Sequence, residues 1–491
     1  MKLNKTKYLN KLNLTLFAVV FAAIGSYVII NSFAATTPVG KANLWIDTTG
    51  GTCVHNTSTV GGDYIDNQAC GSMQAAIAAC TPGDTIRMKS GNYTSEPAIT
   101  SVKASPGCTI IGGDGGTTTV NSISPKGAWF EIQNVSVTGS VSFEDVGNGL
   151  PNHVTFRNVN AAQPSFWDGG DNISWIGGKI GPYSLQPQSY NGCFNIQGAP
   201  NPMTNITLDG LDISGCTRSA SRISAGDHTE VIRLNEGIDN LIIRNTTFNN
   251  EDVNSACIFF GSTGAGPAAE KNITVENNWF GSGCNVTYDG NLGSAGDVCS
   301  GYTFSFNTST SNSPGSFTHS NNNTLVYCKM TNVVVRGNLL KSGSSVCWTG
   351  SNYGSGATYD HNVWINGSNI NCGTNSGDKT IASGGFAGTD FHINSGSGAL
   401  DIPGLGNCPA TDKDGDTRPQ GAGCDAGADE YQSGTTPTPK PGDTNNDNVV
   451  NIIDLSTLLS KWNTNYSAAD FNKDNTVNIF DLSILLSNYG K

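Results

Sequence analysis

Residues 205–213 read Asn-Ile-Thr-Leu-Asp-Gly-Leu-Asp-Ile, and residues 240–248 read Asn-Leu-Ile-Ile-Arg-Asn-Thr-Thr-Phe. Both segments follow one phrase, in which an Asn precedes alternating apolar residues, then a Gly or Asn, and then a large apolar residue three positions later. Alternation with period two predicts a strand, and a Gly or Asn at a fixed offset predicts a corner. Each copy of the phrase therefore predicts a strand, a corner and a second strand.

The phrase recurs through the middle of the chain. Further copies begin at Asn172, Asn272 and Asn332, a weaker copy begins at Ala357, and the long gap before Asn332 predicts an extra coil at residues 302–306. A unit of this kind that repeats every few dozen residues is typical of a solenoid, and no helical pattern separates the copies. The sequence therefore predicts an all-β parallel β-helix. Its expected corner residues are Gly177, Gly210, Asn245, Asn277, Gly337 and His361.

The beginning of the array has features of its own. Residues 72–79 predict a short helix capped by Ser72, residues 82–88 predict the first strand, and residues 91–93 predict its turn. A cysteine, a short helix, Pro-Gly-Asp-Thr-Ile and Gly-Asn-Tyr in this order resemble the opening of exported right-handed parallel β-helix proteins of the pectate-lyase-like kind. The resemblance covers about residues 41–430 and implies a right-handed solenoid, in a fold that hosts many activities.

Residues 414–430 resemble the segment that closes many such β-helices. The alternative is a calcium loop from Asp412, Asp414 and Asp416. The twelfth position of that loop is Gly423, which has no carboxylate. The segment is therefore interpreted as structural.

Two copies of one loop stand 27 residues apart near the C-terminus, starting at Asp443 and Asp470. Oxygen-bearing side chains at positions 1, 3, 5, 9 and 12, with a backbone carbonyl at position 7, are what calcium requires. Asn448 and Asn475 occupy position 6, where Gly is usual, and Asn tolerates the left-handed conformation needed there. The sequence predicts two calcium ions, with the ligands Asp443, Asn445, Asp447, Val449, Asn451, Asp454, Asp470, Asn472, Asp474, Thr476, Asn478 and Asp481.

A helical pattern follows each loop, with apolar residues at i, i+3, i+4 and i+7 from Leu455 and again from Leu482. Loop–helix units without an entering helix resemble a type I dockerin, and the resemblance covers residues 442–491. It implies calcium binding and docking onto a cohesin-like domain. Many dockerins carry hydroxyl residues at the recognition positions, so the apolar side chains here leave an unusual or intramolecular partner open. The recognition positions are Ile452, Ile453, Ile479 and Phe480.

Two groups of charged residues are candidates for catalysis or glycan binding. Asp209, Arg244 and Glu276 occupy one outward position in consecutive repeats and are expected to be neighbours. An Arg between carboxylates would bind a uronate, or act as the base in β-elimination beside a calcium ion in the solenoid; the alternative is a ladder of salt bridges. His228 and Glu230 would form an acid–base pair or a metal site, or else a pair that stabilises a turn.

The first 34 residues predict a signal peptide. Four lysines precede an apolar run at residues 14–30, and Ser32 and Ala34 fit a cleavage site; the alternative is an uncleaved membrane anchor. The 14 cysteines predict disulfides in a secreted or cell-surface protein, among them Cys284–Cys299 and Cys408–Cys424. The formal charge of −13 argues against nucleic acid as a partner.

The sequence thus divides into a signal peptide at 1–34, a β-helix at 35–432, a Pro/Thr linker at 433–441 and a dockerin at 442–491. Because dockerins mostly accompany carbohydrate-active enzymes, the resemblance implies an exported polysaccharide-degrading enzyme tethered to a cohesin-like partner. Glycoside hydrolase and polysaccharide lyase stay open. The alternatives are a non-catalytic glycan-binding or adhesive solenoid and a structural component of the cell surface.

Overall fold

The computed structural model describes residues 40–94, 96–144, 151–167, 169–185, 192–198, 201–225, 230–235, 237–249, 252, 256–261, 271–281, 298–310, 329–341, 357–365, 377–383, 385–386, 391–432, 441–444, 450 and 452–489. The chain divides into two compact units, residues 1–430 and residues 431–491, and each is described by itself. The expected signal peptide and the linker up to residue 440 lie outside the described residues.

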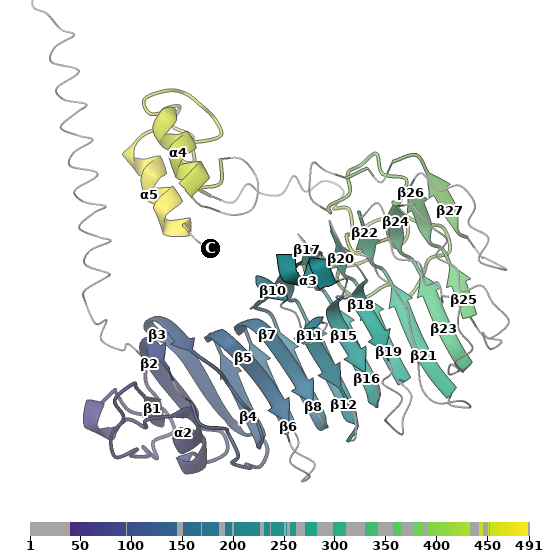
Figure 1. Ribbon diagram of the computed structural model, residues 1–491. Coiled ribbons are helices and arrows are strands. Elements are labelled where there is room, and N and C mark those ends of the chain that lie inside the picture. The colour runs from purple at the N-terminus through teal and green to yellow at the C-terminus, as the bar shows by residue number, and fades with distance from the viewer. Residues whose placement is uncertain are drawn as a thin grey trace, which may run out of the picture. The chain divides into compact units, whose positions relative to one another are not determined.

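The first unit is a parallel β-helix, in which the chain winds through three stacks of strands (Figure 1). Every strand ladder among the described residues is parallel, so the predicted fold class is confirmed. The longest stack, here the first sheet, runs the length of the unit. It contains β1 (Leu44–Ile46), β2 (Thr85–Tyr93), β3 (Cys108–Val120), β4 (Ala128–Gln133), β6 (Asn152–Arg157), β8 (Gly170–Ile176), β12 (Met203–Asp209), β16 (Ile238–Arg244), β19 (Lys271–Glu276), β21 (Val298–Ser305), β23 (Lys329–Arg336) and β25 (Ala357–Asp360).

Two further stacks complete each coil. The second sheet follows the first across one corner, and its later members are β9 (Lys179–Ile180), β13 (Asp212–Ser214), β17 (Thr247–Asn249), β20 (Trp279–Phe280), β22 (Thr308–Ser309), β24 (Leu339–Lys341), β26 (Val363–Ile365) and β27 (Lys379–Ile381). The third sheet contains the second halves of β5 (Ser136–Glu144) and β7 (Asn160–Trp167), followed by β11 (Gly192–Gln197), β15 (Glu230–Asn235) and β18 (Ala256–Gly261). Beside these stacks lie the pair β10 (Tyr183–Leu185) and β14 (Cys216–Arg218) and the helix α3 (Ala220–Ala225).

The corner between the first and second sheets is made by single residues in the left-handed conformation. All six expected corner residues adopt it, with φ between 53° and 69°. Gly and Asn accept positive φ more readily than other residues, which explains their recurrence at this position. In the extra coil at residues 302–306 the same place is taken by Phe306, with φ 52°.

The residue after this corner forms a buried ladder of amides that the repeat analysis did not predict. Backbone N–H groups of Asn278, Asn307 and Asn338 each donate to the side-chain oxygen of the next Asn, at 2.9 to 3.2 Å. The N–H of Asn362 donates in the same way to the carboxylate of Asp378 at 2.7 Å. Their Nδ2 groups donate to main-chain carbonyls at the preceding corner, such as that of Phe304 at 2.9 Å. The ladder satisfies backbone groups that the corner would otherwise leave buried without a partner.

The start of the solenoid is covered by η1 (Asp66–Gln68) and α2 (Met73–Ala79). The side chain of Ser72 accepts a hydrogen bond from the N–H of Ala75, so the predicted helix cap is confirmed. Disulfides Cys53–Cys70, Cys80–Cys108, Cys193–Cys216 and Cys408–Cys424 link described residues, and the last was expected from the sequence. The other expected pair involves Cys284, which lies outside the described residues.

Residues 391–432, here called the closing segment, pack on strands of the second sheet. Phe391 stacks on Trp279 with ring centroids 5.0 Å apart, and the N–H of Ala428 donates to the hydroxyl of Thr308 at 2.8 Å. Asp412 accepts the N–H groups of Asp414 and Asp416 at 2.9 Å each. These bonds make Asp412 a hydrogen-bond acceptor that shapes the turn.

The second unit consists of two helices behind two loops. The helices are α4 (Ile452–Ser460) and α5 (Ile479–Asn488). They pack through a small apolar core that includes Val450, Leu458, Val477 and Leu485. None of the helices in the described part of the chain is long and apolar enough to cross a membrane.

Candidate functional site

The second loop of the C-terminal unit gathers carboxylates around its own backbone. Asp481, which is fully buried, accepts the N–H groups of Phe471 and Asn478 at 2.7 and 2.8 Å. Asp470, which is 8% exposed, accepts the N–H groups of Asp474 and Asn475 at 3.1 and 2.8 Å. Asn475 has φ 66°, the left-handed conformation expected at the sixth position.

The oxygen set of this loop fits a hard cation such as calcium. Asp474 lies at the loop surface, and hydrogen bonds from the amides of Asn472 and Asn478 lower the pKa of its carboxyl group. The Nδ2 group of Asn478 also lies 2.7 Å from the carbonyl oxygen of Thr476, the expected seventh-position ligand. Carboxylates and a backbone carbonyl are the kinds of ligand that calcium prefers.

Asn478 has a second use in the described geometry. Its side-chain oxygen accepts the N–H of Phe480 at 2.8 Å and caps α5. An oxygen used in this way reaches an ion through water, which is common at the ninth position of calcium loops.

The first loop has an equivalent buried acid at its twelfth position. Asp454 is fully buried and accepts the N–H and hydroxyl of Thr444 at 2.8 and 3.0 Å, as Asp481 accepts the N–H of Phe471. Asp443, at the first position, is 3% exposed. Four expected ligands lie outside the described residues: Asn445, Asp447, Val449 and Asn451.

The proposed recognition residues of this unit are apolar and exposed. Ile452 and Ile453 begin α4, and Ile479 and Phe480 begin α5, with exposed fractions of 55 to 66%. Four large apolar side chains at equivalent positions of a duplicated unit are uncommon on a surface without a partner.

In the solenoid, the expected charged column is present in the strand register. Asp209 pairs with Arg244 and Arg244 pairs with Glu276 across β12, β16 and β19. The guanidinium of Arg244 lies 2.7 and 2.8 Å from one oxygen of Asp209, whereas Glu276 accepts the hydroxyl of Ser305 at 3.0 Å. The repeat analysis did not assign Ser305 to this column, because its coil lacks the starting Asn of the phrase.

Other arginines of the first sheet also form ion pairs with carboxylates of neighbouring strands. Arg336 lies 2.9 Å from Asp360, and Arg157 lies 2.8 Å from Glu131. Such pairs on a partly exposed surface contribute at most about 1 kcal/mol each. Arg244 and Asp209 are paired as the salt-bridge alternative expects, whereas Glu276 bonds Ser305 instead of Arg244; a role of the three residues in catalysis or glycan binding stays a prediction.

The other candidate pair is described only in part, because His228 lies outside the described residues. Glu230 is the first residue of β15, is fully buried, and lies 3.4 Å from Arg233. The Nε group of Arg233 donates to the side chain of Asn235 at 3.1 Å.

Arg233 belongs to a polar row on the third sheet that the sequence did not reveal. In the register it adjoins Asn195, which adjoins Ser165, and these two side chains are 1% and 9% exposed. Buried polar and charged groups on the outer side of a sheet are costly unless they have partners or a function. No repeated phrase marks these strands, so the row is visible only once the strands are aligned.

Comparison with known families identifies the C-terminal unit. The family model described as "Dockerin type I domain" matches residues 441–488. This unit is a type I dockerin. Type I dockerin domains bind calcium and imply a cohesin partner, in agreement with the two loops. A dockerin together with disulfides indicates an extracellular protein.

No curated protein sequence matches the chain. Among solved structures, pectate lyase Pel9A is 13% identical, with a TM-score of 0.43, and the match covers 82% of this chain and 99% of that one. The family 6 alginate lyase AlyGC is 12% identical, with a TM-score of 0.31 and coverage of 62% and 51%. A mannuronic-acid-specific family 6 lyase from the human gut microbiota is 13% identical, with a TM-score of 0.29 and coverage of 62% and 79%.

Proposed function

We propose that this chain is an exported polysaccharide-degrading enzyme, a glycoside hydrolase or a polysaccharide lyase, which its dockerin tethers to a cohesin-bearing partner. The observation that carries the proposal is the presence of a type I dockerin and a parallel β-helix in one chain. A β-helix offers long, flat sheets on which a polymer chain can lie across several coils. A dockerin adds attachment to a larger assembly.

The dockerin is proposed to hold two calcium ions, one in each loop. The buried acids of the two loops are equivalent, with Asp443 matching Asp470 and Asp454 matching Asp481. Calcium binding would replace hydrogen bonds that the loop now makes to itself and would fix the start of each helix. The exposed apolar residues Ile452, Ile453, Ile479 and Phe480 are proposed to contact the partner, which would present an apolar surface in return.

For catalysis, the pair of Glu230 and Arg233 on the third sheet is a stronger candidate than the charged column. Glu230 is a fully buried carboxylate 3.4 Å from Arg233. Arg244, in contrast, is 46% exposed and already engaged with Asp209. Buried ionisable groups with a charged partner are enriched at functional sites, whereas an exposed ion pair is common on any protein surface.

The proposal is tested on a panel of neutral polysaccharides and polyuronates, with reducing ends and unsaturated products measured in parallel. Hydrolysis yields only the first signal, and β-elimination yields both. Glu230→Gln preserves the shape of the side chain and is expected to lower product formation at least a hundredfold. Arg244→Ala serves as the matched control and is expected to keep wild-type activity.

Each outcome assigns the site. If Arg244→Ala abolishes product while Glu230→Gln does not, the column of Asp209, Arg244 and Glu276 is the active surface. If both variants keep full activity, neither group is catalytic. Circular dichroism and melting temperatures of each variant separate loss of chemistry from loss of folding, and Arg233→Gln provides a second probe of the buried pair.

A non-catalytic glycan-binding solenoid is the second candidate. It is favoured by the alternating ion pairs of the first sheet, Arg244 with Asp209 and Arg336 with Asp360. Such a protein would bind a polysaccharide of the panel and release no product from it. Retention on immobilised polysaccharide without either product signal would establish this function in place of the enzyme.

A further inference from the structure

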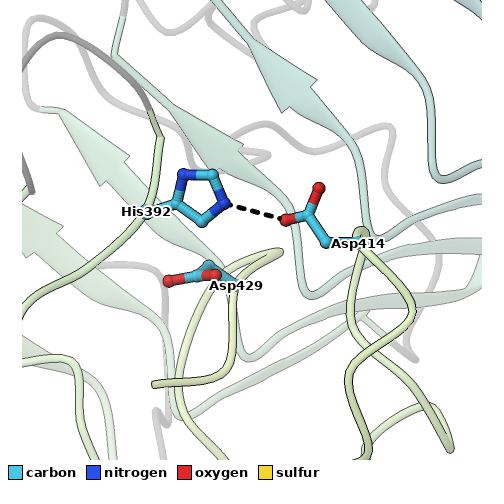
Figure 2. A group of neighbouring side chains, drawn as sticks. All are labelled: His392, Asp414 and Asp429. Atoms are coloured by element: carbon cyan, nitrogen blue, oxygen red, sulfur yellow. Dashed lines mark hydrogen bonds and ion pairs between the residues drawn. The ribbon is translucent and has the colours of Figure 1, made fainter. Parts of the chain in front are cut away.

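Three parts of the closing segment bring a histidine and two aspartates together. His392, Asp414 and Asp429 are far apart in the sequence, and Figure 2 shows their side chains facing one another. The Nε2 atom of His392 lies 3.1 Å from a carboxylate oxygen of Asp414, and one ligand atom from each of the three residues lies within 4.8 Å of the others. The sequence did not predict that these three residues form a group, because no short spacing connects them.

The separations suit a small dication. Two ligand atoms at about 2.05 Å from a tetrahedral zinc ion lie about 3.3 Å from each other. The His392–Asp414 separation of 3.1 Å is already close to this value. The ligand atom of Asp429 lies within 4.8 Å of the other two, so it would have to approach them by at most about 1.5 Å.

Asp429 is the most buried of the three residues, and only one of its two carboxylate oxygens accepts a hydrogen bond in the described part of the chain. Asp429 is 5% exposed, and one of its carboxylate oxygens accepts a hydrogen bond from the N–H of Ile393 at 2.7 Å. In the described part of the chain, the other oxygen receives no hydrogen bond, and no Lys or Arg forms an ion pair with Asp429. A buried carboxylate in this condition is costly unless a cation or a proton neutralises it.

The nearby basic groups are engaged elsewhere. The closing segment contains seven acidic and two basic residues, a formal charge of −5. The ammonium group of Lys413 lies 4.4 Å from the centre of the Trp279 ring, and the guanidinium of Arg418 donates to the carbonyl of Gly427 at 2.7 Å. Arg418 also lies 3.6 Å from the carboxylate of Glu430, so in the described residues neither basic side chain forms an ion pair with the three ligands, and the segment keeps its negative charge.

We propose that His392, Asp414 and Asp429 bind one divalent cation of the zinc class. The imidazole nitrogen selects zinc and similar transition metals over calcium, which takes oxygen ligands only. Water completes the fourth position. The ion joins three separate stretches of the closing segment and so fastens this segment over the second sheet, at the end of the solenoid where the described disulfide is Cys408–Cys424.

The test uses the full-length chain in saturating calcium, so that the dockerin loops are filled. Zinc is titrated by calorimetry, and cobalt is titrated while its visible absorption is recorded, since cobalt bands report nitrogen and oxygen ligands directly. The expected result is one zinc ion per chain. His392→Gln and Asp414→Asn are each expected to weaken zinc binding at least tenfold.

Asp416→Asn is the matched control. It removes one negative charge from the same turn, but only the backbone of Asp416 takes part in the contacts described, so zinc binding should stay at the wild-type level. The chain has six histidines, and zinc held by another of them would survive His392→Gln. Equal zinc affinity in the wild type and His392→Gln, or no zinc binding in the wild type, overturns the proposal. Asp429→Asn gives an independent check, because it removes the buried charge while keeping the acceptor for Ile393.

Discussion

The dockerin and the β-helix are both built from repeats, but they use the repeated positions differently. In the dockerin, the acids of one short loop accept hydrogen bonds from the backbone of the same loop, as Asp470 does from Asp474 and Asp481 from Asn478. In the β-helix, equivalent residues of successive coils form lines along the axis, as Asn278, Asn307 and Asn338 do. A repeat that closes on itself makes a binding site, and a repeat that stacks on its neighbours makes a scaffold. The functional groups of the solenoid are therefore to be sought where the repeat is interrupted.

The largest effect is expected in the dockerin. Asp443→Asn together with Asp470→Asn should abolish calcium-dependent folding of this unit and binding to the partner, because each loop would lose the negative charge of its first ligand. Either substitution alone should weaken partner binding without abolishing it. Calorimetry with calcium and a partner-binding assay measure both effects. Calcium-dependent heat that persists in the double variant would contradict the idea that the loops converge on an ion.

The next effect concerns the buried amide ladder. Asn338→Ala should lower the free energy of unfolding by about 3 kcal/mol, because it leaves the N–H of Asn307 and the carbonyl of Phe304, both in the neighbouring coil, without these partners. Denaturant unfolding of the full chain measures the change. A loss below about 1 kcal/mol would mean that solvent or a local rearrangement replaces the ladder, and that this line of residues is not a scaffold.

A third prediction concerns the start of α2, the helix that covers the beginning of the solenoid and belongs to neither the solenoid repeat nor the dockerin repeat. One oxygen of Glu96 accepts the N–H of Met73 at 2.8 Å, and burial raises the pKa of this carboxyl group from 4.5 to about 7. The folded state therefore binds the proton more tightly than the unfolded state, so this group favours folding below pH 4.5 and its contribution is lost as the pH rises to about 7.

Glu96→Gln should accordingly stabilise the solenoid at pH 8, on the order of 1 kcal/mol after solvent screening is allowed for, and leave its stability at pH 4 nearly unchanged. Melting temperatures of both proteins across this range give the measurement. A variant that is less stable at pH 8 would show that the charged form of Glu96 supports the helix start instead.

The smallest effect is expected at the exposed column. Arg244→Ala should lower the free energy of unfolding by about 1 kcal/mol or less, because the pair with Asp209 is partly exposed and screened. The same unfolding assay used for Asn338→Ala gives a direct comparison of the two lines of residues. A loss as large as that of Asn338→Ala would place the outer column among the main supports of the fold.

Structure could be predicted from the sequence where a residue's role depends only on its neighbours along the chain. Gly210 and Asn245 were predictable as corners because positive φ restricts the choice of residue, and the loop at Asp470 because its ligands lie within 12 positions. The amide ladder could have been found, since Asn follows the corner residue in four consecutive coils.

Other features depend on register or on distant segments. Ser305 adjoins Glu276 only because an atypical coil, with Phe306 at its corner, enters between two regular copies of the phrase. The row containing Asn195 and Arg233 is fixed by the stacking of strands that share no sequence pattern. His392 and Asp429 meet through the path of the closing segment, which no periodicity describes.

The closing segment also determines how mechanical load enters the solenoid. Tension on the dockerin during attachment to a partner reaches the first unit at residue 430, near the end of the closing segment. Near its C-terminal end, that segment is hydrogen-bonded to coils before β27, through Ala428 to Thr308 on β22 and through Gly427 to the carbonyl of Gly337 at 2.8 Å. A pull from the tether is therefore shared by several coils at once.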